Sequence, residues 1–143
     1  MKIKKNVLSK KGFTLVELLV VIMIIALLAS MVAPNLFNKL EDAQRKTTKT
    51  QLSNLSTALD SFRLDFGRYP TTEEGLAILS AKQSTLKKWN GPYLTKKLKD
   101  DAWGNPYVYK YPGKDGNEYE LLSYGADGKE GGSDKNADIS VWE

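Results

Sequence analysis

The feature that most constrains this chain is an apolar run near its N-terminus. Residues 13–33 contain one charged side chain, Glu17, and Ser30 is the only polar residue between positions 18 and 33. As an α-helix, a segment of this length measures ~31 Å, which matches the ~30 Å hydrocarbon core of a bilayer. We therefore expect residues 13–33 to form a single transmembrane helix.

The surplus positive charge of the chain lies entirely before this run. The formal net charge is +4, yet residues 34–143 hold 16 basic and 16 acidic side chains. The first 12 residues contain no acid and five lysines: Lys2, Lys4, Lys5, Lys10 and Lys11. Lysines on this side of the span predict a cytoplasmic N-terminus and an exported C-terminal part. Since no basic domain remains, we expect no nucleic-acid partner.

An ordinary secretory signal peptide also begins with a basic region and an apolar run. Cleavage at a small-residue site such as residues 28–30 would then release a soluble binding module. Three features argue against this alternative: the run exceeds the usual ~7–15 residues, Glu17 lies just inside its start, and a helical pattern continues beyond it.

Glu17 has two interpretations. It lies near enough to the membrane interface to stay hydrated, or it pairs with a positive charge from another subunit. A lone carboxylate inside a bilayer costs a few kcal/mol even on permissive scales, and such groups usually have a partner.

Residues 11–17, Lys-Gly-Phe-Thr-Leu-Val-Glu, resemble the class III leader of type IV pilins and pseudopilins. The resemblance implies that a prepilin peptidase cuts between Gly12 and Phe13 and methylates the new N-terminal Phe13. It also implies that residues 1–12 are removed, that 13–33 stay in the product, and that Glu17 neutralises a neighbouring subunit's N-terminal amine during assembly. Pairing is physically reasonable because each buried charge costs less beside the other.

Residues 34–66 are expected to continue as an amphipathic helix. Leu36, Leu40 and Ala43, and then Leu52, Leu55, Leu59, Phe62 and Phe66, recur at helical spacing, and Gly67 is suited to end the helix. Pro34 should kink or loosen it, as a proline does at this place in pilin-like fibres. The wholly polar stretch 45–51 is expected to face solvent. The upper stripe should pack on the chain's own globular domain, and the lower, all-round apolar part should lie in lipid or in a bundle of identical helices.

Residues 67–143 are expected to form a small α+β region. Residues 68–76 predict a loop that enters a short helix capped by Thr71 or Thr72. Residues 107–111 and 119–124 predict two strands joined by a hairpin connection at 112–117. The expected fold is α+β: one long N-terminal helix packed on a small antiparallel sheet.

Three further segments, residues 67–76, 103–107 and 123–132, resemble the major pseudopilin of the type II secretion system more closely than pilins in general. The resemblance implies a pilin-like fold and a structural subunit that polymerises into a periplasmic fibre driving export of folded proteins through the outer membrane. It also implies anchoring in the inner membrane, with a cytoplasmic leader and a periplasmic C-terminal domain. The expected partners are identical subunits, minor pseudopilins, the inner-membrane assembly platform and the prepilin peptidase.

Two other functional classes are less well supported. A type IV pilus subunit for adhesion, motility or DNA uptake commonly has a C-terminal disulfide, whereas this chain has no cysteine. An anchored enzyme would need catalytic groups, yet the chain lacks histidine and cysteine and shows no Gly-x-Ser-x-Gly elbow. We therefore expect that this chain is not an enzyme.

The last loop, residues 124–139, is rich in oxygen-bearing side chains of the kind that Ca²⁺ prefers. From the residues alone a solvated turn loop is the simpler interpretation, since Ile139 stands where an EF-hand loop would have its glycine. The resemblance instead implies a calcium site, with Asp127 and Asp138 as the best-matched ligands. Asp134 or Asn136 and the backbone carbonyl of Tyr124 would complete the shell.

Overall fold

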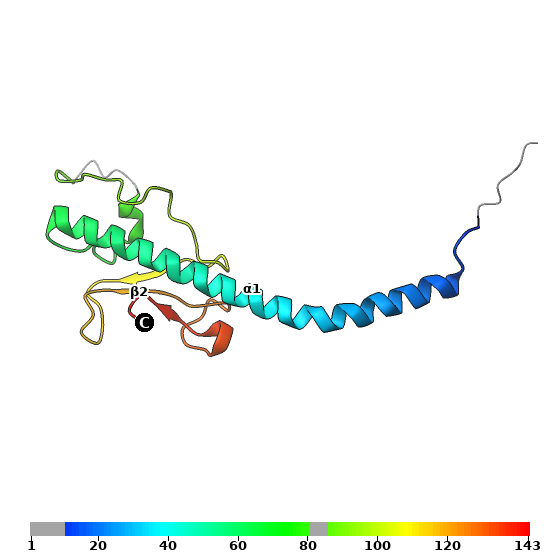
Figure 1. Cartoon of the computed structure of the whole chain (residues 1–143). Helices are drawn as coiled ribbons and strands as arrows, with labels where there is room; N and C mark the ends of the chain where they lie inside the picture. The colour runs from blue at the N-terminus through cyan, green and yellow to red at the C-terminus, as the bar shows by residue number, and fades with distance from the viewer. Residues whose placement is uncertain (1–10, 81–85) are drawn as a thin grey trace, which may run out of the picture. The chain divides into compact units, whose positions relative to one another are not determined.

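The computed structural model describes residues 11–80 and 86–143. Its elements follow in the order α1 (Leu15–Phe66), η1 (Leu76–Leu79), β1 (Val108–Lys110), β2 (Glu120–Ser123), η2 (Asp134–Asn136) and β3 (Ile139–Ser140) (Figure 1). The chain divides into two compact units, Met1–Lys39 and Leu40–Glu143, which are described separately.

The first unit contains the apolar part of α1. Within the described residues α1 is the one helix long and apolar enough to cross a membrane, with a mean hydropathy of 2.9 and none of that window buried in the subunit. The Ser30 hydroxyl donates to the carbonyl of Leu27 at 2.6 Å, so the one polar residue between positions 18 and 33 is satisfied within the helix. Pro34 lies inside α1 without interrupting it; the expected kink stays a prediction.

The second unit packs one face of α1 against the rest of the chain. The buried residues of this face are Leu52, Leu55, Ala58, Leu59 and Phe62, and they share a core with Tyr69, Leu76, Ile78, Leu79, Tyr109, Tyr119, Leu121 and Ile139. Leu59 and Phe62 are completely shielded from solvent. The predicted stripe is therefore confirmed from Leu52 onward, and α1 ends at Phe66 before Gly67, whose φ is 69°, as expected for a glycine that ends a helix.

The sheet is antiparallel with strand order β1-β2-β3. Tyr109 faces Leu121 across the first pair, and Ser123 faces Ile139 across the second. All four side chains are buried and belong to the core or border it, and the sheet lies beside the second half of α1 (Figure 1). The hairpin of β1 and β2 is confirmed within its predicted ranges, and the long helix with a small antiparallel sheet confirms the α+β fold.

One expectation about α1 was wrong. The stretch 45–51 does not simply face solvent, because Thr48 is completely buried and its hydroxyl accepts the Ala102 N–H at 3.3 Å. Leu36, Leu40 and Ala43 are exposed, and the buried face of α1 begins at Thr48. Polar side chains are buried here because loop backbone, rather than a strand, covers this part of α1.

A buried carboxylate organises the turn after residue 100. Asp101 is 5% exposed, and its Oδ1 accepts the N–H groups of Trp103 at 3.0 Å and Asn105 at 2.9 Å. Its Oδ2 accepts the hydroxyl of Ser123 at 2.6 Å, which lies on β2. Asp101 therefore joins this turn to the sheet.

Asp101→Ala should destabilise the domain by about 2–3 kcal/mol, because it leaves two N–H groups and one hydroxyl without their acceptor in a poorly hydrated place. Asp100→Ala is the matched control: that side chain is exposed, and its removal should change stability by less than about 0.5 kcal/mol. Denaturant unfolding of the full chain in detergent, followed by circular dichroism, gives both values. Equal stability of the two variants would contradict this role.

Candidate assembly and metal sites

The start of α1 is closed by a reciprocal cap between Thr14 and Glu17. The Thr14 hydroxyl accepts the Glu17 N–H at 3.2 Å, while Oε2 of Glu17 accepts the Thr14 N–H at 2.9 Å. The same oxygen lies 3.2 Å from the Thr14 hydroxyl. This is a capping box, which satisfies N–H groups that a helix terminus otherwise leaves free. A carboxylate is also favourable here because the helix dipole is positive at its N-terminus.

The cap places the Glu17 carboxylate beside the backbone that carries the predicted cleavage site. Gly12 and Phe13 directly precede Thr14, and Phe13 is 91% exposed. The expectations of cleavage after Gly12 and methylation of Phe13 stay predictions. A threonine followed three residues later by a glutamate, just before an apolar run, is a known sequence signal for such a cap, so the cap is a feature that the sequence could have predicted.

The C-terminal loop, residues 124–139, closes on itself. The Ala126 N–H donates to the Lys135 carbonyl at 3.0 Å. A Cβ at Gly125 would meet the Ala137 carbonyl oxygen at 2.8 Å, and one at Gly132 would meet the Asn136 carbonyl oxygen at 2.5 Å. Since both glycines also have positive φ, they permit an approach of the backbone that a larger residue would block.

The carboxylates of this loop differ in their surroundings. Asp127 is exposed, and its Oδ1 accepts the Lys129 N–H at 3.1 Å. Asp138 is half-buried: its Oδ2 accepts the Gly131 N–H at 2.9 Å, whereas Oδ1 is buried with no hydrogen-bond partner in the described structure. Asp134 is exposed at the start of η2. In the described residues no cluster of three or more metal-binding acidic, histidine or cysteine side chains comes together.

Tyr124 borders this acidic loop. Its pKa is raised, first by burial and then by the nearby negative charges of Glu130 and Asp138. The unpaired oxygen of Asp138 has the chemistry of a cation ligand, because a buried anionic oxygen without a partner is costly. Any further ligands would have to include backbone carbonyls, as was expected for Tyr124.

Arg45 ties the loop to α1. Its guanidinium donates to the carbonyls of Asp134 and Ala137, both at 3.1 Å, and the Lys135 ammonium lies 3.7 Å from the Glu41 carboxylate. The polar stretch 45–51 predicted a solvent-facing Arg45, and no local pattern reveals a partner about 90 residues away.

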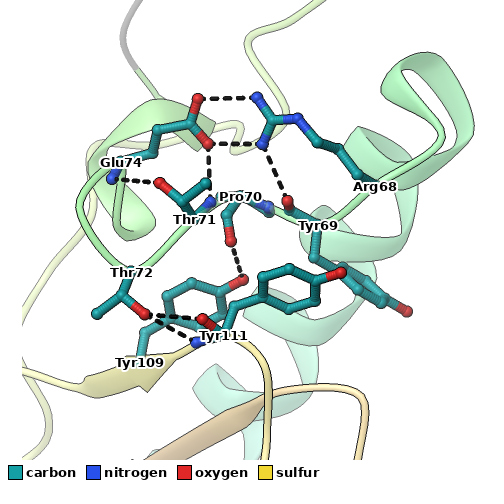
Figure 2. A network of polar contacts seen from close by, with 8 residues as sticks. All are labelled: Arg68, Tyr69, Pro70, Thr71, Thr72, Glu74, Tyr109 and Tyr111. Atoms are coloured by element: carbon teal, nitrogen blue, oxygen red, sulfur yellow. Dashed lines mark hydrogen bonds and ion pairs between the residues drawn. The ribbon is translucent and has the colours of Figure 1, made fainter.

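The segment from Arg68 to Glu74 forms a second polar network (Figure 2). Arg68 and Glu74 make a paired contact with distances of 2.7 and 2.9 Å, and Glu74 also accepts the Thr71 N–H at 2.8 Å. The Thr71 hydroxyl accepts the Glu74 N–H at 3.2 Å, so the predicted cap by Thr71 is found. It closes the turn before η1 and not η1 itself, whose N-cap is Gly75.

The same segment is fastened to β1 and its following residue. The buried Tyr109 hydroxyl donates to the Pro70 carbonyl at 2.8 Å. The Thr72 hydroxyl exchanges two hydrogen bonds with the backbone of Tyr111, each 3.0 Å (Figure 2). These contacts give the polar residues of the segment 68–74 a structural role, because they join the end of α1 to the sheet.

A long apolar N-terminal helix leading into a small domain with an antiparallel sheet is the architecture of a pilin-like subunit, and this helix is long and apolar enough to cross a membrane. Two families match the chain: "Prokaryotic N-terminal methylation motif" over residues 8–33, and "Type II secretion system (T2SS), protein G" over residues 35–142. The chain belongs to the type II secretion system protein G family.

Relatives and a solved structure agree with this assignment. The type II secretion system core protein G of Pseudomonas aeruginosa is 42% identical over 138 residues, covering 94% of this chain and 96% of the relative. The core protein G of Vibrio cholerae is 41% identical over 141 residues, covering 96% and 95%. The crystal structure of the major pseudopilin from the type 2 secretion system of enterohaemorrhagic Escherichia coli matches with a TM-score of 0.60 and 32% identity, over 76% of this chain and 95% of the other. These matches support the pseudopilin interpretation and not the type IV pilus alternative.

Glu74→Gln should reduce the acid sensitivity of the domain. Arg68 holds the pKa of Glu74 below its ordinary value of 4.5, so the unfolded chain binds the proton more readily than the folded one. The stability from this pair is therefore present above pH 4.5 and lost as the pH falls through the depressed pKa. Glutamine can still accept the Thr71 N–H but leaves no charge for Arg68.

Glu73→Gln is the matched control, because Glu73 is exposed. Melting temperatures measured on both sides of pH 4.5 should fall less steeply with acid for Glu74→Gln than for Glu73→Gln or the unmodified chain. Parallel curves for all three would show that the pair does not contribute.

Proposed function

We propose that this chain is the major structural subunit of a type II secretion pseudopilus, a periplasmic fibre that drives export of folded proteins through the outer membrane. The observation that carries the proposal is that one chain joins an N-terminal methylation motif at 8–33 to a protein G domain at 35–142. The relatives are named for a secretion system rather than for a catalysed reaction, and the role we infer is structural.

The helix supplies the physical reason for polymerisation. Its side chains between Leu15 and Val32 are exposed in the isolated subunit, for example Ile25 at 60% and Leu28 at 58%. Such a surface is stable in lipid, because apolar side chains gain free energy when removed from water at about 25 cal/mol per Å². If the helix leaves the bilayer, equivalent helices of other subunits must replace the lipid. A fibre with a helical core meets this requirement.

We assign the cellular path accordingly. The precursor spans the inner membrane once, with residues 1–12 in the cytoplasm and the domain in the periplasm. A prepilin peptidase removes the leader after Gly12 and methylates Phe13. Identical subunits then assemble with minor pseudopilins on an inner-membrane platform. Glu17 acts in assembly through the amine of a neighbouring Phe13, and Pro34 lets the helix adjust its course in the fibre.

Glu17→Gln should be processed normally but assemble poorly, because glutamine preserves the capping box and removes only the negative charge. Thr14→Ala is the complementary variant, which weakens the cap and keeps the charge. Mass spectrometry of the N-terminal peptide checks processing, and the yield of sheared fibres checks assembly.

Normal fibres from Glu17→Gln would contradict charge pairing and leave capping as the role of Glu17. An N-terminus after Ala29 or Ala33, in place of methylated Phe13, would mean ordinary signal cleavage and would overturn the pseudopilin assignment.

We also propose that the C-terminal loop holds Ca²⁺. Asp127 and Asp138 would be its main carboxylate ligands, with Asp134 or Asn136 and the Tyr124 carbonyl beside them. The support is the buried, unpartnered Oδ1 of Asp138 together with the hard-oxygen chemistry of the loop. A bound cation would supply positive charge to this oxygen and staple a small domain that has no disulfide.

Calcium removal should lower the melting temperature of the full chain. Asp127→Ala and Asp138→Ala should each lose this sensitivity, because a ligand that binds only the folded state stabilises it. Asp115→Ala is the control: that carboxylate is exposed on the hairpin turn between β1 and β2 and should leave the response to EGTA intact. A melting curve unchanged by EGTA would contradict the site.

A further inference from the structure

A groove of the second unit lies between α1 and the segment that follows Tyr93. Its volume is about 540 Å³, and α1 contributes Gln51, Asn54, Leu55 and Ala58 to its wall. The other wall is the segment 93–99, with Leu94 and Leu98 among its lining residues. The groove is lined by polar and apolar side chains in similar measure, and Leu55 and Ala58 on one wall with Leu94 and Leu98 on the other supply its apolar part, its apolar floor.

Two hydroxyls of the helical wall are bonded within the helix. The Thr57 hydroxyl donates to the Ser53 carbonyl at 3.1 Å, and the Ser61 hydroxyl donates to the Thr57 carbonyl at 3.0 Å. Hydroxyls bonded to their own helix do not demand hydrogen bonds from an occupant. An apolar side chain can therefore lie against Thr57 and Ser61 without leaving their hydroxyls unpaired.

The rim of the groove is strongly basic. Lys96, Lys97 and Lys99 line it and are exposed, and the segment 86–99 contains five lysines and no acid. None of the four ion pairs found in the described residues uses a lysine of this segment. An occupant should combine apolar side chains for the floor with carboxylates for the rim.

This chain carries such a segment on the exposed side of α1. Leu36, Phe37 and Leu40 are 63%, 62% and 53% exposed, and the acids Glu41 and Asp42 follow directly. These apolar residues come three to seven positions after residue 33, which is ~4–10 Å beyond the predicted span at the rise of an α-helix. Once the helix leaves the bilayer they need protein contacts, because exposed apolar clusters of this kind mark interaction surfaces.

We propose that the groove of one subunit receives residues 36–42 of a neighbouring copy, with Leu36, Phe37 or Leu40 on its apolar floor and Asp42 near its lysine rim. The inference rests on the proposed fibre and names the surfaces that build it. Groove and segment are different patches of one chain, so the contact is heterologous, and contacts of that type repeat into open helical filaments. The complementarity is twofold: apolar floor to apolar side chains, and lysines to carboxylates.

Site-directed cross-linking tests the contact. The chain has no cysteine, so Lys97→Cys combined with Asp42→Cys introduces the only thiols. An ion-paired lysine and aspartate keep their Cβ atoms further apart than the ~3.8 Å of a disulfide, and a short bismaleimide is therefore the reagent. The full-length variant is expressed in cells that have a type II secretion system and assemble it into fibres. The fibres are sheared off, treated with the reagent and analysed on denaturing gels.

The expected result is a ladder of dimers, trimers and larger products, because each subunit contributes one thiol to each neighbour. Lys97→Cys with Glu130→Cys is the matched control, since Glu130 is an exposed acid of the C-terminal loop, and it should give no ladder. Fibres that form without a ladder, or a ladder from the control pair alone, would overturn the proposed contact and leave the fibre intact. Failure of the unmodified chain to form fibres would instead overturn the proposed function and the contact with it.

A charge exchange gives a second, independent measurement. Lys97→Glu should reduce the yield of sheared fibres, and adding Asp42→Lys should restore it, because the exchanged pair again has opposite charges. Restoration supports the contact. If the second substitution reduces the yield further, the two side chains do not face each other and the proposal is wrong.

Discussion

The structure depends on one constraint: a single helix must be covered by two different surroundings. In α1 the side chains from Leu52 to Phe62 that face the domain are buried in the subunit's own core, whereas the apolar window nearer the N-terminus has none of its residues buried. Apart from the helix ends and the Ser30 carbonyl, which meets no N–H at Pro34, the backbone groups of α1 are paired within the helix, so α1 can persist in water, lipid or protein. Only the side chains decide what must surround it, and in the first unit they require lipid or other apolar helices.

The domain on the second half of α1 is held together by loops as much as by its sheet. Its three strands contain at most four residues each, and there is no disulfide among the described residues. Polar side chains add the hydrogen bonds that such short strands cannot provide. Asp101 accepts hydrogen bonds from three donors, Arg45 donates to two carbonyls of the last loop, and Arg68 pairs with Glu74. The contacts of Asp101 with Ser123 and of Arg45 with the last loop join segments that lie far apart in sequence, whereas the pair of Arg68 and Glu74 holds a local turn.

The division between predicted and unpredicted features follows from this design. The apolar run, the stripe from Leu52 and the hairpin of β1 and β2 depend on periodicity and turn chemistry within a few residues, and the sequence displays both. The burial of Thr48, the anchoring by Arg45 and the strand β3 depend on partners at least 16 residues away. No local pattern distinguishes a polar residue that meets such a partner from one that meets water. The cap of Thr14 and Glu17 differs from these features because its sequence signal is local. The charge of Glu17 points instead to a distant partner, and this second interpretation hides the local one.

That cap changes how the carboxylate of Glu17 should be understood. An isolated carboxylate at the bilayer edge has a high free-energy cost. Here the backbone N–H and the hydroxyl of Thr14 in the same subunit bond to the Glu17 carboxylate and already reduce that cost. A neighbouring amine would therefore not rescue a bare charge. It would add a cationic partner to an oxygen that is already hydrogen-bonded and oriented, and a carboxylate oxygen has lone pairs for both. The free energy gained by pairing is then smaller than the cost of a lone buried charge suggests. The ion pair also loses less side-chain conformational entropy when it forms, because the Glu17 side chain is already held in place. The arrangement suits a subunit that must be stable alone in the membrane and must still join a fibre.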